Sequence, residues 1–241
     1  MALGVLLFAT GYLRLHYPSK SRYPIRGIDV SHHQGEIDWE MLKRNDVSFA
    51  YIKATEGMDF KDTRFQQNWE EARTAGISRG AYHFFTFCSP GDLQAEHFLR
   101  VAPPEARTLP LAVDIEFAGN CRNWSSIEDI RRELSVFLNK LLAAGVRDPV
   151  LYVTRESYRR IVAGEFPSYK LWIRGVFRKP ALVAGQDWLF WQFADRGKLS
   201  GVNGFIDLNV FRGARSDFAS ILSTGDQRLN ESPATEEPSN D

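Results

Sequence analysis

The sequence predicts a single α/β domain, an irregular (β/α)8-like barrel of the TIM type whose helices are reduced in the C-terminal part. Short apolar runs alternate with helical stretches from Ile25 onward, which is typical of βα units around a parallel sheet. Eight such runs are present, which suggests a (β/α)8-like barrel. A chain of 241 residues with 44% hydrophobic content can bury one sizeable core, so its length does not require a second domain.

The expected strands are the eight apolar runs, in order Gly27–Val30, Phe49–Ala54, Gly80–Phe85, Leu111–Glu116, Val150–Val153, Leu171–Ile173, Leu189–Phe193 and Phe205–Leu208. The expected helices between them are Trp39–Arg44, Arg64–Ala75, Leu93–Val101, Ile127–Ala144 and Arg155–Ala163. Ser125 precedes Glu128 by three residues and predicts a capping box for the longest helix. No comparable helix separates the last three strands, which predicts the irregularity of the barrel.

Two terminal segments differ in composition from the barrel, which we assign to residues 23–222. The apolar run 1–13 is shorter than the roughly 20 residues that span a bilayer, but it matches the ~7–15-residue apolar region of a signal peptide. We expect residues 1–22 to be an export signal or short membrane anchor plus linker; an ordinary N-terminal helix packed on the barrel is the alternative. Residues 223–241 are polar and acidic, which predicts a disordered tail.

The balance of charge argues against a nucleic-acid partner. Lysine plus arginine and aspartate plus glutamate number 30 each, and no dense basic stripe is visible in the sequence. The chain has neither a G-x-S-x-G motif nor a Walker-type phosphate loop, which disfavours acyl and phosphoryl transfer. Its two cysteines lack zinc-site spacing. We therefore expect no metal and no cofactor. We also expect the protein to be a monomer.

Asp114 and Glu116 close the run Leu111–Glu116 and are the central candidates for catalysis. Two residues apart on a strand, their side chains share a face and lie roughly 6.6 Å apart along the backbone. Active residues of such barrels lie at the C-terminal ends of the strands. Burial and mutual repulsion can keep one carboxyl protonated beside an ionised one, as glycoside hydrolysis requires. The competing interpretation is that one of them caps a loop or pairs with an arginine.

Two further acids fall in the first and last strands, Asp29 in the first and Asp207 in the last. The first and last strands of a closed barrel are neighbours, so these carboxyls are expected to approach each other and the central pair. Four acids on one rim would cost stability through repulsion unless the site uses them.

Other polar residues near the strand ends carry weaker signals. His32 and His33 are adjacent and, on an extended segment, would point in opposite directions. Lys53 and Glu56 are expected to form a supporting ion pair or to hydrogen-bond a sugar. A metal centre built from Asp29, His83 and Asp114 is conceivable but is not expected.

Six blocks, in order, resemble those of the glycoside hydrolase family 25 muramidases, the Chalaropsis-type lysozymes. The blocks are Asp29–Trp39 (DVSHHQGEIDW), Tyr51–Gly57 (YIKATEG), Gly80–Phe84 (GAYHF), Asp114–Glu116 (DIE), Trp191–Phe193 (WQF) and Asp207–Asn209 (DLN). The resemblance extends from about Gly27 to Phe211. It implies an irregular barrel that hydrolyses the β-1,4 bond between N-acetylmuramic acid and N-acetylglucosamine of peptidoglycan.

The resemblance also implies roles for the four acids. Glu116 falls at the family's proton-donor position, and Asp114 falls where an aspartate stabilises the transition state or orients the substrate's N-acetyl group. Asp29 and Asp207 match the other two rim acids. The nucleophile is either Asp114 or the acetamido oxygen of the substrate. The positions of Asp114 and Glu116 suit both routes, so this choice stays open.

The chain departs from the family's pattern at Arg174, which follows Trp172-Ile173 where many members have alanine. It also has no cell-wall-binding repeats after the barrel, so the groove itself must hold the glycan. Tyr82, Trp172 and Trp191 are candidates for sugar contact, together with Lys53 and Gln192. Each of the three aromatic residues suits the barrel core equally well.

Cys88 and Cys121 follow the third and fourth strands by a few residues, so their loops are expected to be neighbours on the active-site face. Two free thiols, or a disulfide that would be sensible only in an oxidising compartment, both remain open. The apolar N-terminus and the cysteine pair favour a secreted or periplasmic protein that faces the envelope. The N-terminal segment is also a candidate for membrane attachment. The alternatives to a muramidase are a non-catalytic wall-glycan-binding barrel and a hydrolase of another aminosugar polymer such as chitin.

Overall fold

The chain folds into one closed barrel, as the sequence predicts. The computed structural model describes residues 17–182 and 186–223. Eight strands form the barrel: β1 (Arg26–Val30), β2 (Val47–Glu56), β4 (Ser78–Phe84), β5 (Ala112–Ile115), β6 (Val150–Val153), β7 (Leu171–Arg174), β8 (Trp188–Gly197) and β9 (Ile206–Phe211). The pairing of β1 with β2 closes the barrel, and β3 (Phe60–Lys61) extends it as a short hairpin on β2.

The last strand departs from the parallel arrangement that the βα pattern predicts. β9 runs antiparallel to both of its neighbours, β8 and β1. Only residues 198–205 connect β8 to β9, whereas a parallel crossover needs a dozen residues or more. The start of β9 therefore lies on the rim where the parallel strands end, and this direction carries Asp207 to that rim.

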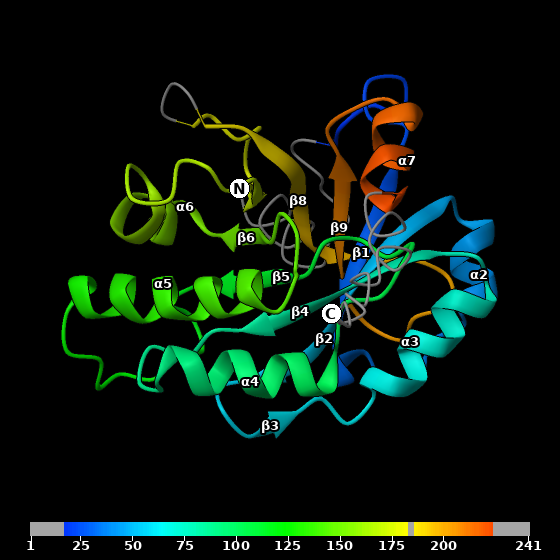
Figure 1. Ribbon diagram of the computed structural model, residues 1–241. Helices are drawn as coiled ribbons and strands as arrows, with labels where there is room; N and C mark the ends of the chain where they lie inside the picture. The colour runs from blue at the N-terminus through cyan, green and yellow to red at the C-terminus, as the bar shows by residue number, and fades with distance from the viewer. Residues whose placement is uncertain (1–16, 183–185, 224–241) are drawn as a thin grey trace, which may run out of the picture.

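Helices cover the first half of the barrel and become sparse in the second half (Figure 1). The helices are α2 (Trp39–Arg44), α3 (Phe65–Thr74), α4 (Gly91–Val101), α5 (Ile127–Ala143), α6 (Arg155–Ser157) and α7 (Arg215–Ser223), with a 3-10 turn, η1 (His32–Gln34), and a π-helical turn, η2 (Tyr158–Val162). No helix of the described chain lies between β7 and β9, which confirms the reduction expected in the C-terminal part.

The cap of α5 differs from the expected one by a single residue. Ser126, and not Ser125, is the N-cap, and its hydroxyl accepts the backbone N–H of Asp129. The helix begins at Ile127, so the residue three positions after the cap is Asp129 and Glu128 falls outside the pairing.

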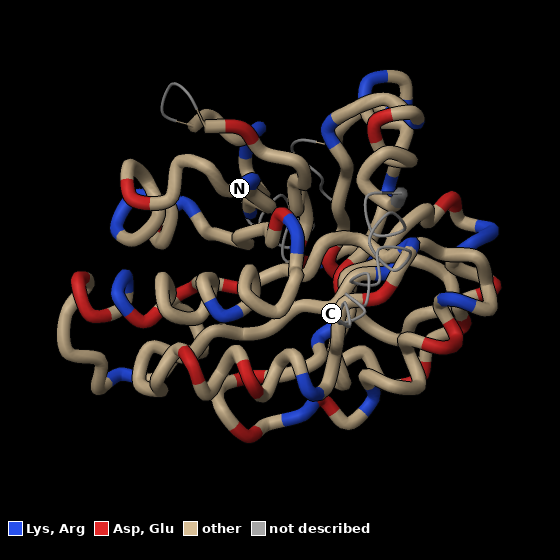
Figure 2. The backbone as a smooth tube through the Cα atoms, viewed as in Figure 1, with Lys and Arg blue, Asp and Glu red and all other residues tan. Residues whose placement is uncertain are grey.

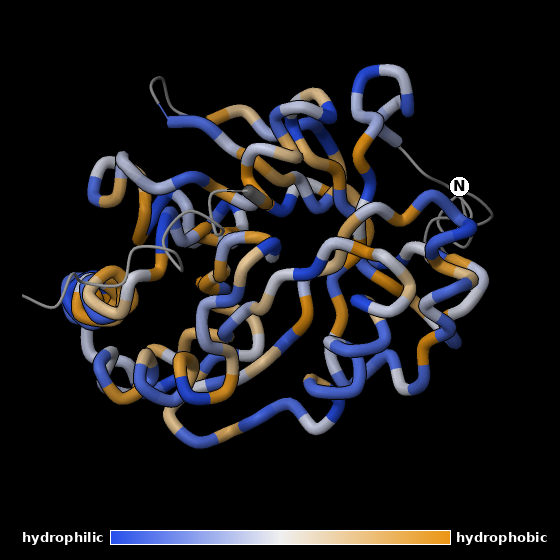
Figure 3. Tube along the Cα trace, turned by 45° about the vertical axis from the view of Figure 1, so that its right-hand side comes forward, coloured by the Kyte–Doolittle hydropathy of each residue, from blue (hydrophilic) through white to orange (hydrophobic). Residues whose placement is uncertain are grey.

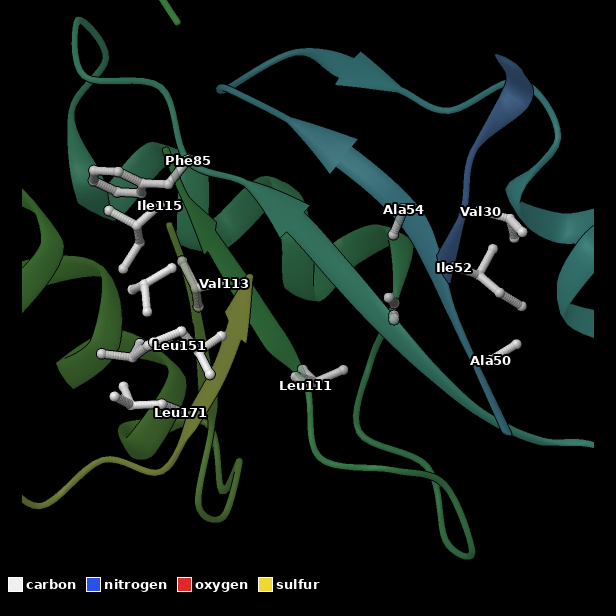
Figure 4. Close-up of a cluster of buried hydrophobic side chains, with 14 of the residues drawn as sticks. Val30, Ala50, Ile52, Ala54, Phe85, Leu111, Val113, Ile115, Leu151 and Leu171 are labelled. Atoms are coloured by element: carbon white, nitrogen blue, oxygen red, sulfur yellow. The ribbon is translucent and has the colours of Figure 1, made fainter. Parts of the chain in front are cut away.

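Side chains of the barrel strands alternate between two hydrophobic layers. Outward-facing residues such as Ile52, Val113 and Leu151 pack beneath the helices (Figure 4), and hydrophobic positions recur along the strands in Figure 3. The inward-facing residues form a second, largely aromatic cluster that includes Tyr51, Trp172, Phe190 and Phe211. Phe218 of α7 packs on Phe211 at 5.3 Å between ring centroids, so α7 covers the end of the barrel opposite the rim.

The loops after β4 and β5 are joined by a covalent and a polar link. Cys88 and Cys121 form a disulfide, so of the two possibilities left open by the sequence the structure contains the bridge. Asn120 adds hydrogen bonds, because its side-chain amide donates to the carbonyl oxygens of Phe85 and Glu116. The backbone that carries Glu116 is thereby held beside the end of β4.

Of the two predicted terminal segments, only short parts are described. Tyr17 packs edge-on against Phe193 at 4.8 Å, so residues 17–22 contact the barrel. The remainder of the expected export segment and of the expected disordered tail lies outside the described residues. Within the described part, no helix is long and apolar enough to cross a bilayer.

Candidate active site

The four acids of the sequence analysis share the inner face of the barrel at its rim. Ile28 and Val30 belong to the outer layer, so strand alternation turns Asp29 inward between them. The same alternation directs Asp114 and Asp207 inward. Asp29 and Asp207 are direct cross-strand partners between β1 and β9, which confirms that the first and last strands bring them together.

Asp29 is the centre of a buried hydrogen-bond network. Its Oδ2 accepts the side-chain amides of Asn209 at 2.6 Å and Gln192 at 3.0 Å. Gln192 in turn accepts the hydroxyl of Tyr152 at 2.9 Å, and Asn209 accepts the indole N–H of Trp172 at 2.8 Å. These amides present donors to Asp29 in a fixed orientation, and such donors stabilise a carboxylate.

Asp207 carries a proton next to Asp29. Burial, and then the charge of Asp29, raise the pKa of Asp207 to about 10. Burial also raises the pKa of Asp29, but the hydrogen bonds from Asn209 and Gln192 oppose that rise. Because like carboxyls in contact cannot both ionise cheaply, the pair holds one proton near neutral pH.

Asp114 and Glu116 lie in different environments although they are two residues apart. Asp114 is only 8% exposed, and burial followed by the charge of Glu116 raises its pKa well above the usual value. Its buried Oδ1 has no hydrogen-bond partner among the described residues. Glu116 follows the end of β5 and is partly exposed, and burial is the main cause that raises its pKa.

The two carboxyls therefore offer different groups to a bound substrate, although burial raises the pKa of both. Glu116 retains a proton to higher pH than a free glutamate and reaches the wall of a pocket of about 370 Å³. A partly exposed, protonated carboxyl can donate its proton to a leaving-group oxygen. Asp114, deeper on the same face, offers an unused acceptor oxygen to whatever is bound above it.

The residues expected to contact sugar divide into inner and outer positions. Tyr82, Lys53 and Gln192 face the interior near the rim, and Lys53 forms the expected ion pair with Glu56 at 2.6 Å. Trp172 also faces inward but is buried against Tyr51, with ring centroids 4.6 Å apart, so it packs the barrel and orients Asn209.

Trp191 is placed in the outer layer, away from the carboxylates. It is 3% exposed, packs edge-on with Tyr23, and donates its indole N–H to the carbonyl of Gly175 at 2.9 Å. Its neighbour Gln192 faces the interior because adjacent strand residues point to opposite faces. We therefore exclude Trp191 from the sugar-binding candidates.

His83 does not join Asp29 and Asp114 at the rim. His83 points outward, fully buried, where it hydrogen-bonds Thr55 and Gln94 and stacks on Phe137 beneath the helices. Among the described residues no group of three potential ligands could hold a metal ion.

The prediction for His32 and His33 was wrong. The segment forms a 3-10 turn and not an extended strand, so the two rings lie together with centroids 4.0 Å apart. His32 bonds Asp62 through Nδ1 at 2.7 Å, which holds this turn beside the loop after β3.

Arg174 belongs to the site, although the sequence analysis identified it only as a departure from the family's pattern. It ends β7, lines the same pocket as Glu116, and pairs with Asp195 of β8. Its charge opposes the rise in the pKa of Glu116. The inward direction of alternate residues along β7 was the signal that could have placed it there.

Comparison with known proteins agrees with this geometry. The family model for glycosyl hydrolases family 25 matches residues 28–202, which is most of the chain. The chain belongs to glycosyl hydrolases family 25. The family 25 hydrolase of Bacillus anthracis has 41% sequence identity and a TM-score of 0.81, over 87% of this chain and 97% of that one.

Two further comparisons connect this family 25 chain to lysozymes. Lysozyme M1 of Streptomyces globisporus is 38% identical over 83% of this chain and 71% of that protein. A bacterial lysozyme from Streptomyces coelicolor superposes with a TM-score of 0.76 and 35% identity, over 83% of this chain and 98% of that one. The resemblance identified from the six sequence blocks is confirmed, and so is the assignment of the chain as a glycoside hydrolase.

Proposed function

We propose that this family 25 hydrolase is a lysozyme that cleaves the β-1,4 bond between N-acetylmuramic acid and N-acetylglucosamine of bacterial peptidoglycan, with Glu116 as proton donor. The observation that carries the proposal is the position of Glu116, which combines partial exposure at a pocket with a raised pKa. Relatives named lysozyme support the substrate class.

Asp114 fits the role of orienting the substrate. Its Oδ1 is buried and unpartnered, and an N–H group of a bound sugar would satisfy it. An acetamido group held in this way could attack the anomeric carbon through its own oxygen, so no enzyme carboxylate needs to be the nucleophile. The raised pKa of Asp114 favours this route, because it disfavours the anion that direct attack requires.

Asp29 and Asp207 fit a supporting role below the reacting groups. The network from Asn209 and Gln192 fixes Asp29, and the shared proton limits the negative charge near Asp114. We propose that this dyad adjusts the protonation of the central pair and positions it.

The envelope is the compartment that suits this chain. The Cys88–Cys121 disulfide would persist outside the reducing cytoplasm, and the proposed substrate lies there too. We propose that the chain acts as a secreted or periplasmic monomer, with attachment through its N-terminal segment as a further possibility to be tested by fractionation.

The proposal is tested by reducing-end release from purified peptidoglycan. We expect Glu116→Gln, which keeps the shape but cannot donate a proton, to lower kcat by about 100-fold or more while binding persists. Glu128→Gln, an exposed carboxyl on α5, is the matched control and should retain the wild-type rate.

Three outcomes would move the assignment elsewhere. Binding of the polymer by the wild-type chain without any release of reducing N-acetylmuramic acid would favour a glycan-binding barrel. Faster cleavage of chitin oligomers would favour another aminosugar polymer. Equal rates for wild type and Glu116→Gln would remove Glu116 from the role of acid.

A further inference from the structure

The pocket beside Glu116 is bounded by three loops that follow β5, β6 and β7. Its wall includes Thr154 and Arg155 after β6 and the segment from Arg174 to Arg178 after β7. Phe177, 64% exposed, is the most exposed large hydrophobic side chain of the described part. The pocket thus brings Glu116 together with basic and apolar side chains.

Two arginines of this pocket, Arg155 and Arg178, and their neighbour Arg159 have no acidic partner among the described residues. Arg155, Arg159 and Arg178 are exposed, and none of them forms an ion pair within the described part of the chain. The positive charges of Arg159 and then Arg178 lower the pKa of Arg155, so both side chains lie close enough to Arg155 to repel it. The basic positions around α6 are visible at the left of Figure 2.

The acids near this cluster are already engaged. Glu156 lines the pocket but pairs with Arg160 at 2.9 Å, and Asp195 pairs with Arg174. Burial raises the pKa of Glu116, which reduces the negative charge that this carboxyl contributes. An anionic ligand entering beside Glu116 would therefore meet arginines whose charge no carboxylate within residues 17–182 and 186–223 neutralises.

We infer that this pocket is an anion-binding subsite that receives carboxylates of the peptide stem attached to the muramic acid residue. The inference rests on the proposed function and specifies which form of the polymer the site prefers. Arginine binds carboxylates through paired N–H donors, and like charges brought together without partners are favourable only when a ligand of opposite charge binds. A neutral glycan such as chitin has no group to place there.

The topology explains why the sequence alone did not reveal this cluster. Arg155 and Arg178 are 23 positions apart and their local segments also contain acidic and apolar residues, so no basic stripe is visible. The loops after β6 and β7 become neighbours only because those strands pair in parallel, with Tyr152 opposite Trp172.

The experiment compares native peptidoglycan with the same polymer after its carboxylates have been converted to neutral amides with carbodiimide and ammonia. We expect the wild-type chain to cleave the native polymer about three to ten times faster, as one or two exposed charge pairs allow. Arg155→Gln/Arg178→Gln should lose most of that preference through a slower rate on the native polymer.

Arg44→Gln/Arg100→Gln is the matched control, because it removes the same charge from the ends of α2 and α4. Both helices lead toward the starts of the following strands, so these arginines lie away from the rim. This control should keep the wild-type preference. Equal preference in the wild type and Arg155→Gln/Arg178→Gln would overturn the subsite.

A binding measurement separates this inference from the proposed function. The probe is a soluble disaccharide–tetrapeptide, as the free acid and as the amide, titrated into the wild-type chain and both double variants. If the wild type binds the free acid more tightly and Arg155→Gln/Arg178→Gln does not, the subsite stands even if no glycan is cleaved. Equal binding of acid and amide by the wild type would overturn it even if cleavage occurs.

Discussion

At the scale of single residues, alternation along the strands decides which side chains reach the site. The acids could be found from the sequence because each occupies the inward parity of an apolar strand near the rim, as for Asp29 between Ile28 and Val30. The same rule places Arg174 inward and Trp191 outward, but an irregularity between Leu171 and Trp172 in the β7–β8 pairing prevents simple counting from one strand to the next.

The protonation of Asp207 predicts a pH dependence of stability. The folded pKa of about 10 lies far above the ordinary value of 3.8, so the contribution of this group is fully present below about pH 4 and is lost as pH rises toward 10. Asp207→Asn cannot ionise and should lose less stability over that range. Thermal melts should show that Tm falls from pH 5 to pH 9 in both proteins. This fall should be about 3–8 °C smaller in the variant than in the wild type.

The matched control for this measurement is Asp217→Asn, a carboxyl of α7 at the opposite end of the barrel. It should follow the wild-type pH dependence. A decrease in Tm of equal size in Asp207→Asn and the wild type would mean that Asp207 does not retain its proton in the folded protein.

Arg174 predicts a shift in the pH–rate profile. Its positive charge lowers the pKa of Glu116, against the rise caused by burial. Arg174→Gln should therefore move the alkaline limb of kcat/KM to higher pH, because Glu116 then keeps its proton longer. Asp195→Asn, which releases Arg174 from its partner, should move that limb to lower pH. Shifts in the same direction for both variants would contradict this electrostatic account.

At the scale of elements, the loops after β4 and β5 form one unit that holds the backbone of Glu116. The disulfide closes a segment with a sequence separation of 33, and Asn120 joins the same two loops through hydrogen bonds. We expect Cys88→Ser/Cys121→Ser to lose about 3–4 kcal/mol of unfolding free energy, the amount that closing a loop of this length contributes.

Urea unfolding with and without reductant measures this contribution. Reductant should lower the stability of the wild type to that of Cys88→Ser/Cys121→Ser and should leave the double variant unchanged. Since Asn120 still links the loops, the reduced protein should keep part of its activity below the unfolding transition. Equal stability of the oxidised and reduced wild type would show that the bridge adds nothing.

The apolar pattern of the sequence predicted that β9 exists, but it did not predict the direction of this strand. The run around Asp207 was recognised as a strand, but its expected bounds, Phe205–Leu208, stop three residues before the true end at Phe211. A strand thought to end near Asp207 agrees with a parallel sheet, whereas the true strand begins there. The short connection from β8 was the physical signal for reversal.

At the scale of the whole molecule, the fold class and family could be predicted because eight apolar runs and six motif blocks recur in order. The positive charge of the pocket could not be predicted from the sequence, because it depends on loops that are far apart in the chain and become neighbours only in the folded barrel. Helix α7 was also missed: Phe218 packs against the aromatic interior, but the sequence around it has only a weak apolar face.

The barrel with its short N-terminal extension should be sufficient for activity. We expect residues 17–223 to retain the kcat/KM of the whole chain and a Tm within about 2 °C, because Tyr17 and α7 are included and both pack on the barrel. The comparison uses peptidoglycan turnover and thermal melts of both forms. A large loss of Tm would assign a structural role to the segments that were removed.

The reversal of β9 has a practical consequence for attaching this protein to something else. Because β1 begins and β9 ends at the barrel end covered by α7, residues 17–25 and α7 lie beside each other in Figure 1, away from the carboxylates. A bead, a surface or a second protein joined at either end of residues 17–223 would leave the mouth of the barrel facing outward. The orientation of the protein on a support therefore follows from the antiparallel direction of β9.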